Sequence, residues 1–474
     1  MRKVTLAIAG LALALAAPGL SQSAVPKLTF ATKPEEAAAV KWLRASGKAF
    51  DPAAYGEAEL APLAALLGQA RVIGIGEATH GSHQDQQFKA ELIKQLVRSG
   101  KMQVLVLEAN RDAGYRIDRY VRFGEGDPAQ VLRTGSFFQI WKDDEFAGLI
   151  LWLRAWNQTA PSKVRVIGID NQDGGRDSLF ALNFIKQFDA PQEPVLRAGL
   201  GTLLPADGSE PGRFLNWYVK ASDAELAKAT TTIAAMQAWF DRAPPAARQD
   251  PGFDDARWAV ETARQSFVIY EVMRPGFDMS KATPEQISAR DRFMASNAIG
   301  MLHEGERAAI WAHDGHVVDE LSWLDLAPGY VSLGSLLEEK LGEQYATVGF
   351  TWSSGTFRAA KIESAGQIPS MALAQPSDVV TLPNDRPGEL GHLFNQTGQR
   401  AMWIDLSTRP QTPLLNSWAR RPYWRGWAGW GVLINDWQKI VPDGELPPEV
   451  GKGHDVIVWF RTISPSRLWP VKPR

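Results

Sequence analysis

The amino-acid sequence predicts an α/β fold, with a mainly parallel open sheet, active-site residues at the C-terminal ends of its strands, and a large helical insertion or cap. Buried-strand patterns alternate with helical patterns in the first and the last parts of the chain, which is typical of βαβ units. The part between them has helical patterns only. Polar residues capable of chemistry follow four predicted strands, at 71–75, 102–107, 164–169 and 308–311.

The strand at 71–75 and the helix after it organise the rest of the chain. Arg71 to Ile75 is branched and apolar, and glycines at positions 74 and 76 end it. A carboxylate and two imidazoles follow on the loop that leaves this strand: Glu77, His80 and His83. Gln84 to Arg98 then predicts a helix, whose apolar stripe is formed by Phe88, Leu92, Ile93 and Leu96.

The other elements are assigned by the same patterns. Residues 25–58 predict an extended lead-in, and Glu59 to Leu67 predicts a short helix that ends at Gly68. Further helices are expected at 115–120 and 144–156, with an aromatic loop at 137–141. Further strands are expected at 345–352, 400–406 and 455–460, separated by loops rich in Gly, Pro and Trp, such as 418–437.

Residues 176–305 form the predicted helical insertion. Strand-like runs disappear there, and long amphipathic patterns occupy 178–188, 210–242, 251–275 and 284–303. Their apolar stripes are expected to pack between helices rather than to hold a cofactor, as for Ile233, Met236, Trp239 and Phe240. We expect residues 25–474 to form one domain that contains this insertion.

Residues 1–24 predict a secretory signal peptide. Arg2 and Lys3 form a positive segment, Val4 to Ala17 is apolar, and small residues follow at the expected cleavage region. The apolar run is shorter than the roughly 20 residues that a membrane-spanning helix needs. We therefore expect a secreted or periplasmic protein that has no membrane segment after cleavage.

The composition argues against several classes of function. With 51 basic and 53 acidic residues, the net charge of −2 gives no electrostatic footprint for nucleic acid. The absence of cysteine excludes thiol nucleophiles, disulfides and thiolate metal sites. No Gly-x-Ser-x-Gly sequence indicates a serine nucleophile. Direct attack by an activated water is therefore better supported than a covalent acyl-enzyme.

The candidate site residues lie at four strand ends. They are Glu77, His80 and His83 after the first strand, Glu108 after the second, Asp170 and Asp173 after the third, and His313, Asp314 and His316 after the fourth. The carboxyl ends of parallel strands share one edge of an open sheet, where ligands bind, so we expect these side chains to converge.

Taken one at a time, these residues also have ordinary structural interpretations. Asp170 is placed to cap the next helix, and Glu108 to pair with Arg111, Arg116 or Arg119. Four of the seven histidines nevertheless lie on two of the strand ends. The other three are interpreted as surface or structural residues: His303, His392 and His454.

Two kinds of chemistry fit this set of residues. A histidine within reach of a glutamate supplies a general base and the partner that orients it, which requires no cofactor. Nitrogen and oxygen ligands that suit a divalent metal such as zinc, iron or manganese are also present, in Glu77, His80, Glu108, His313 and His316. The sequence pattern does not choose between a water held by His and Glu and a water held by metal.

Six motifs, in order, resemble those of the erythromycin esterase family. They are Gly76-Glu-Ala-Thr-His-Gly81, Val106-Leu-Glu-Ala109, Gly168-Ile-Asp-Asn-Gln172, Arg290-Asp-Arg-Phe-Met-Ala295, Trp311-Ala-His-Asp-Gly-His316 and Gly349-Phe-Thr351. The resemblance runs from about residue 40 to about residue 465. It implies one α/β core with helical additions and a deep cleft. It also implies ester hydrolysis by a His-activated water without a covalent intermediate, because the family's best-known members open macrolide lactones and are linked to antibiotic resistance.

Carried over by motif, the resemblance makes His80 the catalytic base, with Glu77 and Glu108 as acidic partners and His313 and His316 as a second histidine pair. It gives Arg290 and Asp291 a structural or substrate-positioning role. We place His83, Asp170 and Asp314 with Arg290 as substrate-binding candidates. Two features depart from the family pattern: Asp314 stands where Asn is expected, and the late loops carry Trp424, Trp427, Trp430 and Trp437.

The leading hypothesis is an exported hydrolase acting on a small-molecule carboxylic ester, such as a macrolide lactone. His80 would activate water, and Glu77 and Glu108 would orient the catalytic groups and neutralise their charge. His313 or His316 would stabilise the oxyanion or protonate the leaving alkoxide. Two alternatives remain. One is a metal-dependent hydrolase that uses the same cluster, and the other is a non-catalytic exported protein whose Trp-rich loops stack on sugar or aromatic ligands.

Overall fold

The computed structural model describes most of the chain, in the ranges 29–133, 141–205, 213–278, 281–319, 330–362, 378–382, 384–426, 428–429, 431–433 and 449–469. The predicted signal peptide lies outside these residues, as do residues 137–140 of the aromatic loop, Trp427, Trp430 and Trp437. The chain divides into two compact units. Unit 1 comprises residues 1–105, 139–164 and 302–474, and unit 2 comprises residues 106–138 and 165–301.

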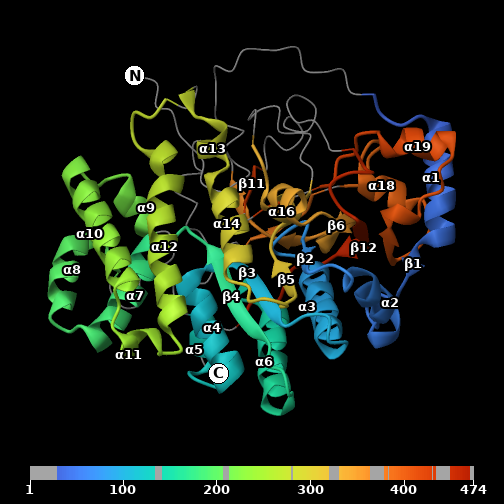
Figure 1. Ribbon diagram of the computed structural model, residues 1–474. Coiled ribbons are helices and arrows are strands. Elements are labelled where there is room, and N and C mark those ends of the chain that lie inside the picture. The colour runs from blue at the N-terminus through green and yellow to red at the C-terminus, as the bar shows by residue number, and fades with distance from the viewer. Residues whose placement is uncertain are drawn as a thin grey trace. The chain divides into compact units, whose positions relative to one another are not determined.

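Unit 1 is built on strands in the order β1-β10-β12-β6-β2-β5 (Figure 1). Their bounds are Lys48–Ala49, Ala401–Asp405, Val456–Ile463, Tyr345–Gly355, Val72–Ile75 and Ala308–Trp311 in that order. The four strands from β12 to β5 are parallel, whereas β1, β10 and β12 pair antiparallel. All four residues of β2 and of β5 are buried, as a parallel strand covered on both faces requires. The predicted α/β class with a mostly parallel sheet is confirmed.

The remaining elements of unit 1 connect or cover these strands. Two short strand pairs join β7 (Phe357–Arg358) to β9 (Val379–Val380) and β8 (Ala360–Ile362) to β11 (Gly431–Leu433). The helices are α1 (Lys33–Ser46), α2 (Glu57–Leu67), α3 (His83–Arg98), α6 (Asp144–Thr159), α15 (Asp314–Val317), α16 (Leu333–Leu341), α18 (Leu390–Asn395) and α19 (Pro413–Ala419), with 3-10 turns at Gly342–Gln344 and Leu406–Thr408.

The prediction of an extended lead-in over 25–58 is wrong, because residues 33–46 form α1. Thr32 and Glu35 make a capping box at its start, which satisfies backbone donors that a helix leaves unpaired. Its buried face packs on α19, where the rings of Trp42 and Trp418 meet edge to face with centroids 5.8 Å apart.

Unit 2 holds β4 (Arg165–Asp170), the part of its neighbour β3 (Val104–Asn110) from residue 106 onward, and a set of helices. The helices are α4 (Arg111–Phe123), α5 (Pro128–Arg133), α7 (Gly174–Phe188), α8 (Gln192–Leu200), α9 (Arg213–Tyr218), α10 (Asp223–Asp241), α11 (Pro245–Arg248), α12 (Phe253–Ile269), α13 (Pro284–Ile287) and α14 (Ala289–Gly300), with 3-10 turns at Gly201–Leu203 and Glu271–Met273. Between 174 and 300, the described residues include helices and no strand, as predicted for this segment.

The apolar stripe on α10 packs as the sequence indicated. Ile233, Met236 and Phe240 are buried, and Trp239 is half-buried and donates its indole N–H to Asp189. No described helix combines the length and the apolar composition that crossing a membrane requires. The extent of the single domain, 25–474, stays a prediction.

Candidate active site

Glu77 is the centre of the site in unit 1. It follows β2 by two residues, and its side chain is fully buried. Its Oε1 accepts hydrogen bonds from His80 Nδ1 and from Trp141 Nε1, the latter at 3.1 Å. Its Oε2 accepts from Gln86 Nε2 at 2.8 Å and from Lys89 Nζ. Four donors therefore fix one buried carboxylate in position and orientation.

The charge of Glu77 is set by its neighbours. Burial alone would raise the pKa of this carboxyl group, but the Lys89 charge and the hydrogen bond from His80 outweigh burial and lower the pKa to about 2. Glu77 is therefore ionised at neutral pH. An ionised carboxylate only accepts hydrogen bonds, so Nδ1 of His80 must be the donor.

This hydrogen bond selects the tautomer of His80. With the proton on Nδ1, the neutral ring presents Nε2 as a hydrogen-bond acceptor and base. The side chain keeps 9% of its surface exposed, whereas that of Glu77 has none. His80 can therefore take a proton from water at Nε2, and the imidazolium that forms lies against the Glu77 anion.

His313 lies beside His80 because β5 pairs parallel with β2, so the residues that follow the two strands share one edge. The ring centroids of His80 and His313 are 5.0 Å apart. The backbone N–H of Gly315 donates to Nδ1 of His313 at 3.1 Å. The neutral His313 ring therefore carries its proton on Nε2. One imidazole is thus held as an acceptor and its neighbour as a donor.

Asp314 and His316 lie on the short helix α15, which begins after His313, and both are buried. The backbone N–H of Asp314 donates to the Glu77 carbonyl at 3.0 Å. Its side-chain Oδ2 accepts from Phe350 N–H at 2.9 Å, which fastens α15 to β6. Burial raises the pKa of Asp314 well above its ordinary value. Its predicted substrate-binding role remains a hypothesis, and these contacts indicate that it holds the loop together.

His83 belongs to a separate histidine–carboxylate pair. Its Nδ1 donates to Glu145, a carboxylate that also accepts from Arg467 Nε at 3.2 Å. Burial would raise the pKa of Glu145, but the hydrogen bond from His83 and the other donors outweigh it, and the net shift is downward. The His83 side chain is 21% exposed. It is therefore accessible to a ligand, but its ring is held by a hydrogen bond to Glu145 rather than to Glu77.

The predicted residues Glu108, Asp170 and Arg290 form a second cluster, in unit 2. Arg290 Nη2 donates to Glu108 at 2.7 Å, and Nε and Nη2 donate to the two oxygens of Asp170 at 3.0 and 2.9 Å. Burial lowers the pKa of Arg290, but the two carboxylates outweigh burial and raise it, so the guanidinium stays charged. The interpretation of Asp170 as a helix cap is wrong, because Asp173 caps α7 through Arg176 N–H.

The structure therefore distributes the predicted residues over two clusters, one in each unit, and the convergence of all four strand ends stays a prediction. Asp291 is buried on α14 beside Arg290. Of the histidines set aside, His303 and His392 pair with Glu306 and Asp385 near the surface. His454 is buried, and burial lowers its pKa well below the ordinary value, so it is a neutral structural residue.

The sequence interpretation missed three residues that hold Glu77: Gln86, Lys89 and Trp141. Gln86 and Lys89 are three positions apart on α3, so they share one helix face. Lys89 has no exposed side-chain surface, donates to Ala312 O at 3.2 Å and lies 4.2 Å above the Trp311 ring. The position of Lys89 next to the apolar stripe of α3 was the available signal that this lysine is buried. A buried lysine requires a carboxylate partner, which here is Glu77.

The described side chains offer no ready metal site. No three His, Asp or Glu residues are grouped so that they could hold a metal ion in the part of the chain that the structure describes. Both oxygens of Glu77 already accept hydrogen bonds from nitrogen donors, and Glu108 is paired with Arg290. Each of these two carboxylates thus already has nitrogen partners within its own unit.

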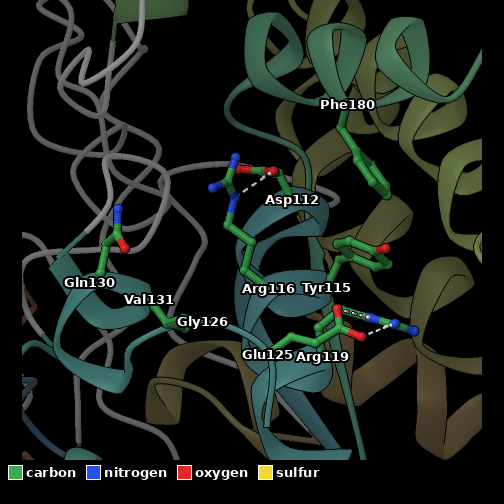
Figure 2. A pocket seen from close by; sticks show the side chains of 9 residues that line it. All are labelled: Asp112, Tyr115, Arg116, Arg119, Glu125, Gly126, Gln130, Val131 and Phe180. Carbon is green, nitrogen blue, oxygen red and sulfur yellow. Dashed lines mark hydrogen bonds and ion pairs between the residues drawn. The ribbon is translucent and has the colours of Figure 1, made fainter. Parts of the chain in front are cut away.

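Unit 2 also contains a cavity of about 320 Å³ along α4, which Figure 2 shows. Its charged side chains neutralise one another: Arg116 donates to Asp112 at 3.0 Å and Arg119 to Glu125 at 2.8 Å. None of the predicted catalytic residues lines it. The cavity therefore supplies no acid–base pair for the chemistry considered above.

Comparison with known families identifies the chain. The family model described as erythromycin esterase matches residues 97–463, which is most of the sequence. The chain belongs to the erythromycin esterase family. At the level of the family it is thus placed among ester hydrolases. The match begins after the Gly76–Gly81 motif, so the assignment of His80 depends on the geometry described above.

The curated relatives in this erythromycin esterase family are distant. Erythromycin esterase type II of Escherichia coli is 20% identical over 303 residues, covering 62% of this chain and 72% of that protein. Erythromycin esterase type I of Escherichia coli is 22% identical over 336 residues, covering 68% and 78%. This degree of similarity leaves the substrate of the present protein to be determined.

Two solved structures show the same fold. A Bacillus cereus protein superimposes with a TM-score of 0.72 and 23% identity, covering 91% of this chain and 99% of that one. A mutant of the erythromycin esterase EreC, in its open conformation, gives a TM-score of 0.66 and 17% identity, covering 90% and 98%. The erythromycin esterase architecture is thus shared over nearly the whole chain.

Proposed function

We propose that this protein is an exported hydrolase that cleaves a carboxylic ester by direct attack of a water molecule activated by His80. The observation that carries the proposal is the buried Glu77–His80 dyad, in which an ionised carboxylate holds Nδ1 as donor and leaves Nε2 as base. Membership of the erythromycin esterase family supports the reaction class. Because the named relatives are erythromycin esterases, macrolide lactones are the first substrates to consider.

In the proposed reaction, Nε2 of His80 takes a proton from water while the water oxygen bonds to the ester carbonyl carbon. The carbonyl oxygen then carries the negative charge, and the Nε2 proton of His313 is a suitable donor to it. The bond from the carbonyl carbon to the alkoxide oxygen breaks next, and the alkoxide takes the proton held by the His80 imidazolium. His80 returns to its neutral form, so no covalent intermediate is needed.

Glu77 and Lys89 set up this cycle without exchanging protons themselves. The imidazolium is stabilised by the adjacent Glu77 carboxylate, and Lys89 keeps that carboxylate ionised and in place. In unit 2, Arg290 fixes Glu108 and Asp170 in one orientation. We assign Glu108 to neutralisation and substrate orientation, as the family resemblance implies.

The proposal is tested with the purified mature protein on macrolide lactones and simple carboxylic esters, with and without chelator. We expect chelator-resistant hydrolysis of at least one ester, and His80→Ala to lower kcat at least about 100-fold, since general-base catalysis contributes 10²–10⁴-fold. His392→Ala, which changes a half-buried histidine paired with Asp385, is the control and should keep wild-type activity. Hydrolysis that requires an added metal, or that survives in His80→Ala, contradicts the mechanism.

We propose export because the charge and the apolar run of the segment before residue 25 match a signal peptide. Expression of the full chain in a Gram-negative host should give a periplasmic or secreted protein that has lost about 24 residues by intact-mass measurement. A full-length mass from the cytosolic fraction would contradict export.

A further inference from the structure

Asp85 connects helix α3 to the turn that carries Glu77 and His80. Its side chain is almost fully buried, and Oδ2 accepts the Ala78 backbone N–H at 3.1 Å. Its own backbone N–H donates to Ser82 Oγ at 3.2 Å, which caps the helix. Ala78 directly follows Glu77 and lies two residues before His80, so this hydrogen bond reaches the middle of the turn.

Other hydrogen bonds also hold the turn, including one from the Gln86 side chain to the His80 carbonyl at 3.0 Å. Gly76 N–H donates to Val348 O at 2.9 Å, Asp314 N–H donates to Glu77 O at 3.0 Å, and Ala428 N–H donates to Ala78 O at 2.8 Å. The Ala78 N–H, in contrast, donates to a titratable side chain rather than to a backbone carbonyl. A change in Asp85 therefore acts on the geometry of the Glu77–His80 pair.

Four titratable groups face Asp85: Glu77, Lys89, Tyr55 and Asp314. Burial and the Glu77 charge raise the pKa of Asp85 to about 7, although its hydrogen bonds and Lys89 act in the opposite direction. Burial raises the pKa of Tyr55, which is therefore neutral near pH 7, and burial also raises the pKa of Asp314 well above its ordinary value. The charge of Asp85 therefore changes near neutral pH. An ionised acceptor makes the stronger hydrogen bond, since charge-assisted bonds are about twice as strong as neutral ones.

We propose that Asp85 is a positioning residue for the reaction at His80, because its carboxyl group fixes the turn between Glu77 and His80 through the Ala78 amide. The proposal rests on the proposed function of His80 as a general base. In its ionised form Asp85 holds the turn for catalysis, and protonation loosens the turn. The sequence offered no sign of this, since Asp85 reads as an ordinary first-turn acid of a helix.

The kinetic test compares Asp85→Asn, which keeps an oxygen acceptor but does not titrate, with Asp85→Ala, which removes the acceptor. Wild-type log kcat should fall more steeply on the acid side than log kcat of Asp85→Asn, because only the wild type loses the Asp85 charge there. Asp85→Ala should lower kcat about 10- to 100-fold with little change in KM, as for a displaced catalytic group. Asp177→Asn is the matched control, a buried carboxyl that also accepts a backbone amide, and should keep the wild-type slope.

Equal acid-side slopes in wild type and Asp85→Asn, or a wild-type kcat in Asp85→Ala, would overturn the proposal. A second readout does not depend on activity or on the folding of a variant. Labelling with [¹³C]Glu and [¹⁵N]Ala restricts the observed amides to alanines that follow glutamate, including Ala78. Its shift should titrate near neutral pH in the wild type, and a pH-independent shift overturns the proposal. If no ester is cleaved, the proposed function fails, while this titration still decides whether the Asp85 carboxyl group acts on the turn through the Ala78 amide.

Discussion

At the scale of single residues, Glu77 shows how one buried charge can organise a site. Burying a carboxylate costs several kcal/mol unless its charge and its lone pairs are matched, and here nitrogen donors engage both oxygens. Lys89 supplies the opposite charge from within the same core. The geometry that orients His80 is therefore maintained by a residue that touches neither water nor substrate.

Removal of Lys89 should accordingly affect both folding and activity. Lys89→Met leaves the buried Glu77 without its cation, and breaking a buried pair in this way costs about 3–5 kcal/mol. Guanidinium unfolding should show this loss, and kcat should fall because Glu77 is no longer held as an anion beside His80. Lys94→Met removes a partly exposed pair with Glu91 on the same helix and should cost no more than about 1 kcal/mol. Similar effects of the two variants would contradict the role given to Lys89.

At the scale of elements, helix α3 was predictable because its apolar stripe repeats at helical spacing, and Phe88, Leu92, Ile93 and Leu96 are buried as expected. Its polar contribution to the site was not predictable. Gln86 and Lys89 meet Glu77 only after β2 and α3 have packed, and an isolated lysine in a helix usually reads as a solvated residue. Helix α1 was missed because its buried face is completed by α19, far away in sequence.

Strand β3 shows a related error. It was predicted to end at residue 107 but continues to Asn110, so that Glu108 lies inside the strand. A charged residue normally indicates the end of a buried strand. Arg290, a partner distant in sequence, balances this carboxylate and allows the strand to continue.

The turn after β2 gives a prediction at the same scale. A Cβ atom on Gly76 would overlap the Asp314 carboxyl group, so Gly76→Ala should displace α15 from the turn and lower both stability and kcat. Gly148 lies within α6, and a Cβ atom there meets nothing within 4 Å. Gly148→Ala should therefore leave kcat unchanged and raise stability by about 0.5–1 kcal/mol, as alanine does in a helix interior. Thermal melts and kcat of the two variants test this contrast, and a harmless Gly76→Ala would contradict it.

At the scale of the whole molecule, the sequence patterns predicted the α/β class, a mostly parallel sheet and the helical segment of unit 2. They could do so because strand and helix periodicity is local information. The partners of the charged residues were not predictable in the same way, since His83 with Glu145 and Arg290 with Glu108 and Asp170 are set by tertiary packing. The substrate depends on the shape of the surface around His80, which residue types alone do not specify.

The central claim is that Glu77 and His80 act as one catalytic unit, and a double-mutant comparison tests it most directly. kcat/KM is measured on the best ester for His80→Ala, Glu77→Gln and the double variant, with circular dichroism to confirm folding. Residues that act as a unit are strongly non-additive, so the double variant should be no slower than His80→Ala within about threefold. Losses that multiply, or a Glu77→Gln variant with wild-type activity, would show that the two residues act separately and would contradict this account.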